Sequence, residues 1–200
     1  MDASDYAVPG TLRDGTPVTI RAIRPDDREA LREGFSLLSE RTVYHRFFQT
    51  KHHLTDGELR YLTELDFHNH VGLVVTIGNR AGELIIAVGR VVRLGSGRAG
   101  VRGADRPGTP QHAEVAFVVA DEFQGQGVGS TLLWHLAAIA RELDIRYLDA
   151  EVLPGNRPML DVFEHSGLPI TETTREGLLH VELRLDEEWP PARPVTAAQT

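Results

Sequence analysis

A buried strand that runs into a glycine-rich turn and then directly into a helix most constrains how this chain can fold. Residues 114–120 predict the strand, and Gly125, Gly127 and Gly129 mark the turn. The next helix carries its apolar residues on one face, at Val128, Leu132, Leu136, Ile139 and Leu143. At such a junction the unpaired N–H groups and the positive end of the helix dipole point at one spot, which suits a pyrophosphate.

The spacing of the glycines excludes two common kinds of phosphate-binding site. It matches neither the G-x-G-x-x-G of dinucleotide-binding folds nor the G-x-x-x-x-G-K-[ST] of a P-loop. The alternative is a tight turn that needs glycine only for its bend. Three alternate glycines at the start of a helix exceed what such a turn requires, so we predict a pyrophosphate site.

The rest of the pattern predicts a mixed α/β domain around one sheet. Further strands are expected at 17–23, 70–77, 83–94 and 147–152, and in a hairpin over 170–185 that turns near Glu176-Gly177. Further helices are expected from Pro25, from Ser39, after a Thr55–Glu58 capping box, and over 156–166. We expect an N-terminal segment at 1–16, a domain at 17–188 with a mobile loop at 95–110, and a disordered tail at 189–200.

Charge and composition exclude several functions. A net charge of −8, from 21 basic and 29 acidic residues, argues against a nucleic-acid partner and suits cationic partners such as amines. The absence of cysteine excludes disulfides and a thiol nucleophile. No apolar run predicts a membrane span and the start lacks a signal-peptide pattern, so we expect a cytoplasmic enzyme. The nine histidines show no recognised ligand spacing, so we predict no metal.

Two motifs resemble the GNAT superfamily of acyl-CoA N-acyltransferases. One looks like the pyrophosphate loop of that family, Gln124-x-x-Gly127-x-Gly129, and the other resembles its second signature, from Asn156 through Phe163 to Gly167-Leu168. The resemblance covers about residues 17–185. It implies an α+β fold with a mixed, mostly antiparallel sheet of about six to seven strands, splayed central strands and flanking helices.

Other segments are similar to a narrower group, the bacterial protein lysine acetyltransferases of the Pat type. These segments are Ser39-x-x-Thr42-Val43-Tyr44-His45-Arg46-Phe47-Phe48 and Ala113-Glu114-Val115-Ala116. The similarity implies acetyl-CoA as co-substrate. It also implies a protein acceptor with an exposed lysine, for which a CoA ligase-type enzyme is one candidate.

The resemblance also assigns roles to residues. An amine attacks a thioester only when it is neutral, and the resemblance implies Glu114 as the general base. A solvated glutamate at the strand entrance is the alternative. Cofactor contacts are implied for Phe117, Val118, Val119, Gln124, Gly125, Gln126, Gly127, Val128, Gly129, Ser130, Asn156 and Phe163. Asn156 is also a good helix N-cap. Phe163 stands where many GNAT enzymes have an acidic tyrosine, so no general acid is assigned.

Three functions stay open at this point. Acetylation of protein lysines is the leading hypothesis. A small-molecule amine N-acetyltransferase would share the fold and the base and differ only in its acceptor pocket. A non-catalytic CoA-binding sensor is supported only by the missing tyrosine at position 163. The sequence does not identify the acceptor, the length of the acyl group or the oligomeric state.

Overall fold

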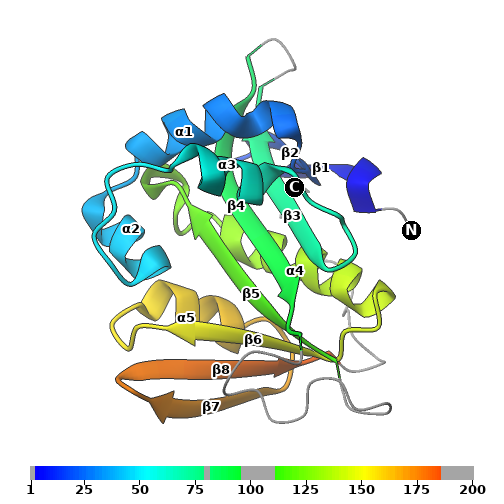
Figure 1. Ribbon diagram of the computed structural model, residues 1–200, viewed down its shortest axis with the longest axis vertical. Helices are drawn as coiled ribbons and strands as arrows, with labels where there is room; N and C mark the ends of the chain where they lie inside the picture. Colours follow the sequence, from blue (N-terminus) through cyan, green and yellow to red (C-terminus); the bar gives the residue numbers. More distant parts are fainter. Residues whose placement is uncertain (1–2, 79–81, 96–110, 186–200) are drawn as a thin grey trace.

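The structure is a computed structural model that describes residues 3–78, 82–95 and 111–185 (Figure 1). One eight-stranded sheet has the order β1-β2-β3-β4-β5-β6-β8-β7, and every neighbouring pair is antiparallel except β5 and β6. The strands are β1 (Ala7–Thr11), β2 (Pro17–Ala22), β3 (His70–Ile77), β4 (Leu84–Arg93), β5 (His112–Val119), β6 (Tyr147–Val152), β7 (Ile170–Arg175) and β8 (Leu178–Arg184). The α-helices are α1 (Arg28–Ser36), α2 (Glu40–Phe47), α3 (Asp56–Thr63), α4 (Val128–Glu142) and α5 (Arg157–Glu164).

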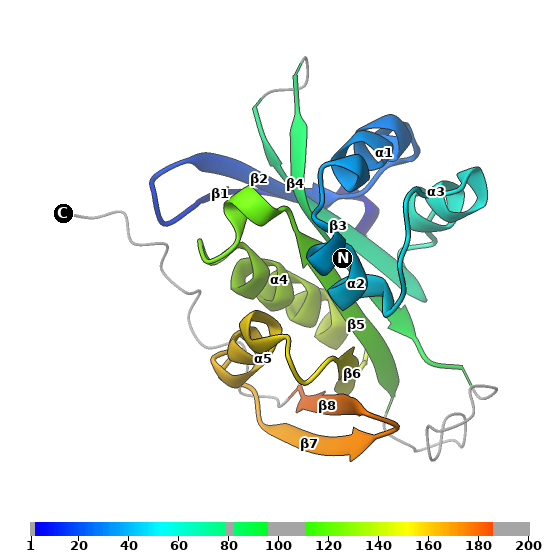
Figure 2. The same cartoon turned by 90° about the vertical axis from the view of Figure 1, so that its left-hand side faces the viewer.

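Helices cover the sheet on both faces and divide the core in two. Helices α4 and α5 pack on one face, and α1, α2 and α3 pack on the other (Figures 1 and 2). The larger core joins α4 and α5 to the sheet, and Leu132, Leu136 and Phe163 belong to it. Helix α4 lies so close to β4 that a Cβ on Gly89 would come within 2.7 Å of Leu132. A glycine in mid-strand therefore sets the distance of α4 from the sheet.

The α+β fold with a mixed, mostly antiparallel sheet confirms the sequence-based expectation. Strands β3 and β6 have the expected limits, and the final hairpin turns at Glu176 and Gly177, which both have positive φ. The sequence pattern predicts no element at Ala7–Thr11, where β1 forms and raises the strand number to eight. Pro9 and Gly10 are residue types that are rare in strands, so the sequence pattern does not predict this one. It forms because it pairs with β2.

The predicted helix starts are confirmed by their caps. The Ser39 side chain accepts a hydrogen bond from the Thr42 N–H at the start of α2, and Thr55 and Glu58 form the capping box of α3. The Asn156 side chain accepts a hydrogen bond from the Met159 N–H and begins α5. Short polar side chains thus supply the acceptors that the first helical turns lack.

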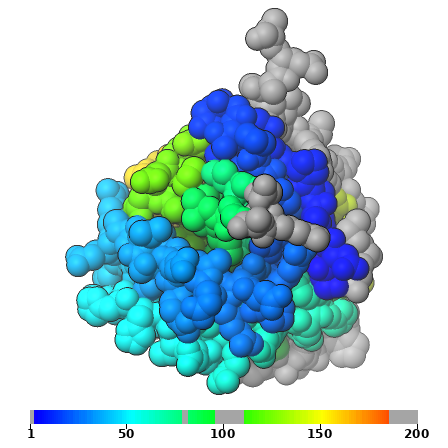
Figure 3. Space-filling view, turned by 90° about the horizontal axis from the view of Figure 1, so that it is seen from above, coloured from blue at the N-terminus to red at the C-terminus, as the bar shows by residue number. Residues whose placement is uncertain are grey.

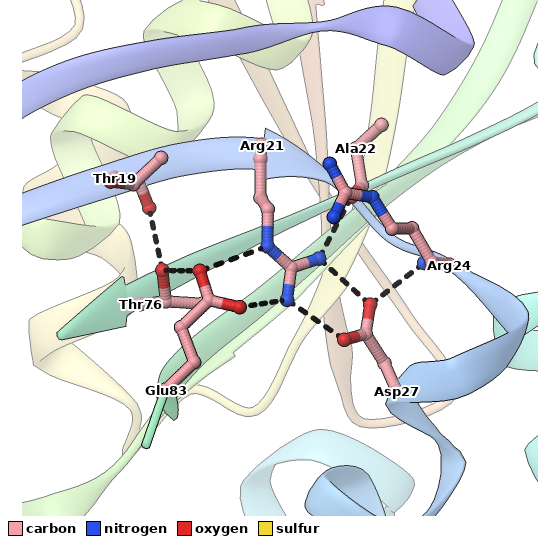
Figure 4. Close-up of polar contacts among 7 residues, drawn as sticks. All are labelled: Thr19, Arg21, Ala22, Arg24, Asp27, Thr76 and Glu83. Carbon is pink, nitrogen blue, oxygen red and sulfur yellow. Dashed lines mark hydrogen bonds and ion pairs between the residues drawn. The ribbon is translucent and has the colours of Figure 1, made fainter. Parts of the chain in front are cut away.

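A buried arginine ties three segments together at the edge of α1 (Figure 4). Arg21 of β2 donates hydrogen bonds of 2.8 Å to both carboxylate oxygens of Asp27, which precedes α1. It also donates to Glu83, just before β4, whose carboxylate accepts from Thr76 as well. Hydrogen bonds to Asp27, and then to Glu83, raise the pKa of Arg21 above its ordinary value. The cluster fixes α1 against the sheet with its charges paired.

Some expectations concern residues whose structure is not described. The mobile loop expected at 95–110 lies outside the described residues apart from Gly95, and the tail expected at 189–200 lies wholly outside them. Within the described ranges, no helix is both long and apolar enough to cross a membrane.

Candidate active site

The two parallel strands at the centre of the sheet separate after a short ladder. Strand β5 pairs with β6 only from His112 to Glu114, opposite Tyr147 to Asp149. Strand β4 continues to pair with β5 as far as Val119. Within the described part of the chain, the edge of β5 that faces β6 therefore has no neighbouring strand from Val115 to Val119, and the two strands diverge from this point (Figure 1). This confirms the expected splay of central strands.

A cleft of about 700 Å³ lies beside the open edge of β5. Helix α2 borders one side of it and α5 the other, and the glycine-rich turn closes its end. Most residues for which the sequence implies a cofactor contact line it: Phe117, Val118, Val119, Gln124, Gly125, Gly127, Val128, Gly129, Ser130 and Asn156. The fold thus brings two motifs that are distant in sequence to one cleft.

Two of the implied residues lie outside this cleft. Phe163 is buried in the core, where its ring contacts Phe117 edge to face at 5.9 Å between centroids, and it lines a smaller adjoining pocket. Gln126 points back along the turn and donates a hydrogen bond to the Glu122 carbonyl.

The glycines of the turn serve two different needs. Gly125 and Gly127 have φ of +74° and +84°, which side chains with a Cβ rarely adopt. Gly129 has no such need, but a Cβ there would lie 3.3 Å from the Phe117 ring and 3.4 Å from Val162. The first backbone bond at this end of α4 runs from the Thr131 N–H to the Gly127 carbonyl. The N–H groups at positions 128–130 therefore have no partner inside the helix and can hold an anion.

A cation from the other end of the chain lies over this turn. Arg13, in the turn between β1 and β2, lines the cleft and donates a hydrogen bond of 3.1 Å to the Gly125 carbonyl. In Figure 3 the blue β1–β2 turn lies beside the yellow-green segment that leads into α4. Sequence reasoning missed Arg13, because nothing local marks it. Its positive charge adds to the helix dipole at the position expected for a phosphate.

Glu114 occupies the last paired position of β5 before the splay. Its side chain is half-buried and lines a small pocket with His45 and Arg46 of α2. Burial, and then the charge of nearby Arg90, lower the pKa of the Arg46 guanidinium to about 10, although the charge of Glu114 opposes this shift. Burial, and then Arg41, lower the pKa of His45. A carboxylate thus lies beside the guanidinium of Arg46, next to the cleft.

A third, apolar pocket lies on the far side of Arg46. It has a volume of about 100 Å³ and lies between α1, α2, α3 and strands β4 and β5. Phe35, Phe47 and Val118 are among its walls. Arg46 lines all three cavities, so α2 forms the wall between the cleft and this pocket.

Helix α2 is fastened to the turn by one carboxylate. Asp121, two residues after β5, accepts hydrogen bonds from the Ser39 N–H at 2.9 Å and from the hydroxyls of Ser39 and Thr42 at 2.7 and 2.8 Å. Burial opposes its ionisation, but these bonds outweigh burial and hold the pKa of Asp121 below its usual value. Gln124 adds hydrogen bonds to the Thr42 hydroxyl and the Val119 carbonyl. We refer to Asp121, Ser39 and Thr42 as the α2 latch.

Sheet, splay and cleft together define an acetyltransferase fold. The sequence profile of the acetyltransferase (GNAT) family matches residues 35–168, and the chain belongs to this family. Members of the family use acetyl-CoA to acetylate amines. The family explains why a strand, a glycine-rich turn and a helix meet at the open edge of β5.

Several individual acetyltransferases are similar to this chain. The acetyltransferase Pat of Mycolicibacterium smegmatis is 32% identical over 160 residues, which are 80% of this chain and 44% of that protein. The chain thus spans less than half of that relative. The GNAT domain of S. lividans PAT has a TM-score of 0.78 at 37% identity, over 89% of this chain and 96% of that one. A cAMP-binding acyltransferase from Mycobacterium smegmatis has a TM-score of 0.58 at 27% identity, over 98% of this chain and 51% of the other.

Proposed function

We propose that this chain transfers the acetyl group of acetyl-CoA to the side-chain amine of a lysine in another protein, with Glu114 as the general base. The position of Glu114 carries the proposal: it is the last residue of β5 that pairs with β6, where these two strands diverge, and its pocket adjoins the cleft. The similarity to Pat-type acetyltransferases supports a protein acceptor. The net charge of −8 suits a partner that offers a cation.

The cleft has the chemistry that the donor requires. N–H groups at positions 128–130 and the guanidinium of Arg13 would bind the pyrophosphate. The open edge of β5 at Phe117, Val118 and Val119 would pair with the amides of the pantetheine arm, and Asn156 would contact it from α5. Acetyl-CoA supplies the acetyl group as a thioester.

Glu114 acts on the acceptor. A lysine amine is almost fully protonated at pH 7, because its pKa is near 10.4, and it must lose a proton before it attacks. Glu114 would accept that proton directly or through one water molecule. A backbone N–H on the open edge of β5 would donate to the thioester oxygen as negative charge develops there. Once the nitrogen–carbon bond has formed, the carbon–sulfur bond would break and CoA would leave as a thiolate, which a thiol pKa near 8.5 allows without a general acid. Arg46 lies close enough to Glu114 for the two opposite charges to attract each other.

The test of the base is Glu114→Gln, which keeps the size of the side chain and removes its basicity. We expect kcat to fall on the order of 100-fold or more while the Kd for acetyl-CoA stays unchanged. Glu172→Gln, at an exposed position of β7, is the matched control and should retain full activity. Equal kcat in the two variants would show that Glu114 is not the base.

The acceptor is tested separately, by mass spectrometry of a reaction of the purified chain with acetyl-CoA and a cell extract. Acetylated lysines in proteins, absent in the Glu114→Gln reaction, are the expected result. If only small amines are acetylated, the protein acceptor is wrong and the base assignment stands. If acetyl-CoA binds but no product of either kind forms, the chain is a CoA-binding sensor.

A further inference from the structure

Three carboxylates form a row across the sheet beside the splay. The register pairs Glu114 of β5 with Asp149 of β6, and Asp149 with Glu182 of β8. These strands are immediate neighbours in the sheet (Figure 1). Like charges directly opposite one another on neighbouring strands destabilise a sheet, so the row requires compensating cations or donors.

Two histidines contact the middle carboxylate. Nδ1 of His112 lies 2.8 Å from one oxygen of Asp149, and Nε2 of His180 lies 3.1 Å from the other. Asp149 is only 6% exposed. The ring of His112 stacks on Tyr147 with 4.6 Å between centroids and an 11° angle between planes, which fixes its orientation. A nearly buried carboxylate is thus held rigidly between two imidazoles.

The outer carboxylate, that of Glu182, is a third possible ligand beside the other two. His112, Asp149 and Glu182 each offer one ligand atom, and these atoms all lie within 4.8 Å of one another. Across residues 3–78, 82–95 and 111–185, no hydrogen bond or ion pair engages the carboxylate of Glu182, which is half-exposed. Imidazole nitrogen and carboxylate oxygen together form a ligand set that Zn²⁺ accepts, whereas Mg²⁺ prefers oxygen ligands alone.

We propose that His112, Asp149 and Glu182 bind a divalent transition-metal ion, with Zn²⁺ the best match. His180 would act as an outer partner whose hydrogen bond orients the Asp149 carboxylate. The site departs from the sequence-based expectation of no metal. That expectation depended on spacing along the chain, whereas His112 and Asp149 are 37 positions apart and meet only because β5 and β6 pair.

The test is calorimetric titration of Zn²⁺ into the chain after dialysis against a chelator, without acetyl-CoA or acceptor. We expect saturable binding of one ion, with much weaker binding of Mg²⁺. His112→Gln and Glu182→Gln should each weaken Zn²⁺ binding by at least about tenfold. His53→Gln, at an exposed position away from the cluster, is the matched control and should bind like the unchanged chain.

Glu182→Gln keeps the proposal testable if the other variant fails to fold. Glu182 is half-exposed and its substitution leaves the contacts of Asp149 with both histidines in place, so a native circular dichroism spectrum is expected. Absence of saturable Zn²⁺ binding, or equal affinity in Glu182→Gln and the unchanged chain, would overturn the proposal. Because the titration involves no acetyl transfer, its failure leaves the proposed enzymatic function untouched.

Discussion

Gly127 lies where a change of charge would act directly on the proposed pyrophosphate site. A Cβ there would lie 3.4 Å from Nε of Arg13, at the N-terminus of α4. The change Gly127→Asp would put a carboxylate where the pyrophosphate is expected. This carboxylate would repel the pyrophosphate and form an ion pair with Arg13, which would otherwise bind the phosphate. We expect the Kd for acetyl-CoA to rise on the order of 100-fold, measured by calorimetry.

Gly177→Asp is the control for that prediction. Gly177, in the turn between β7 and β8, has φ of +83°, close to that of Gly127, and a Cβ there meets nothing within 4 Å, so its substitution introduces the same backbone strain outside the cleft. Its affinity for acetyl-CoA should equal that of the unchanged chain. An unchanged affinity in Gly127→Asp would contradict our placement of the pyrophosphate.

Single residues differ in how well the sequence predicts their roles. Ser39, Thr55 and Asn156 are confirmed as caps because capping depends on neighbours only three residues away. Arg13 lies 112 positions from Gly125, so no local pattern connects it with the turn. The position of Glu114 next to the splay likewise depends on where β5 and β6 stop pairing.

At the scale of elements, the α2 latch decides how firmly α2 closes the cleft. The change Asp121→Ala removes the acceptor for three hydrogen bonds, and bonds to a charged group are worth about 1.5–3 kcal/mol each. We expect amide hydrogen exchange at the start of α2 to become at least about tenfold faster while the rest of the fold keeps its protection.

The neighbouring change Glu122→Ala is the control for the latch. Glu122 lies in the same short turn and is exposed, and its side chain has no part in the latch. Its exchange pattern should match the unchanged chain. If Asp121→Ala gave the same pattern, the latch would not hold α2.

Most elements follow from patterns of apolar residues, and the exceptions have physical causes. Strand β3 is apolar enough to be recognised from residues 70–77 alone. Strand β1 is short and contains Pro9 and Gly10, so only its pairing with β2 reveals it. The order of the strands was not predicted, because register and neighbours depend on contacts between distant segments.

At the scale of the whole molecule, the buried Arg21 cluster makes stability depend on pH. The hydrogen bonds from Arg21 hold the pKa of Glu83 below its ordinary value. A carboxylate with a lowered folded-state pKa stabilises the fold above its unfolded pKa, near 4.3, and this contribution disappears as the pH falls through the folded-state pKa. Glu83→Gln should therefore lower the free energy of unfolding at pH 7 by about 1–2 kcal/mol.

The same variant should also lose stability less steeply between about pH 5 and pH 3, measured by urea denaturation. Glu29→Gln is the control: Glu29 pairs with Arg32 on the surface with 72% of its side chain exposed, and such pairs contribute little. If both variants had the same acid dependence, the cluster would not be responsible for it.

The brief ladder between β5 and β6 has a mechanical consequence. Strands β1 to β5 form one part of the sheet and β6 to β8 the other, and among the described residues the only strand pairing between the two parts is the three residue pairs of β5 and β6. A pantetheine arm bound along the open edge of β5 would add reversible hydrogen bonds beyond the point where the pairing of β5 with β6 ends. Binding of the thioester would then make the connection between the two parts of the sheet more rigid, and its release would make that connection more flexible. The bound donor would thus be a temporary part of the structure that positions it.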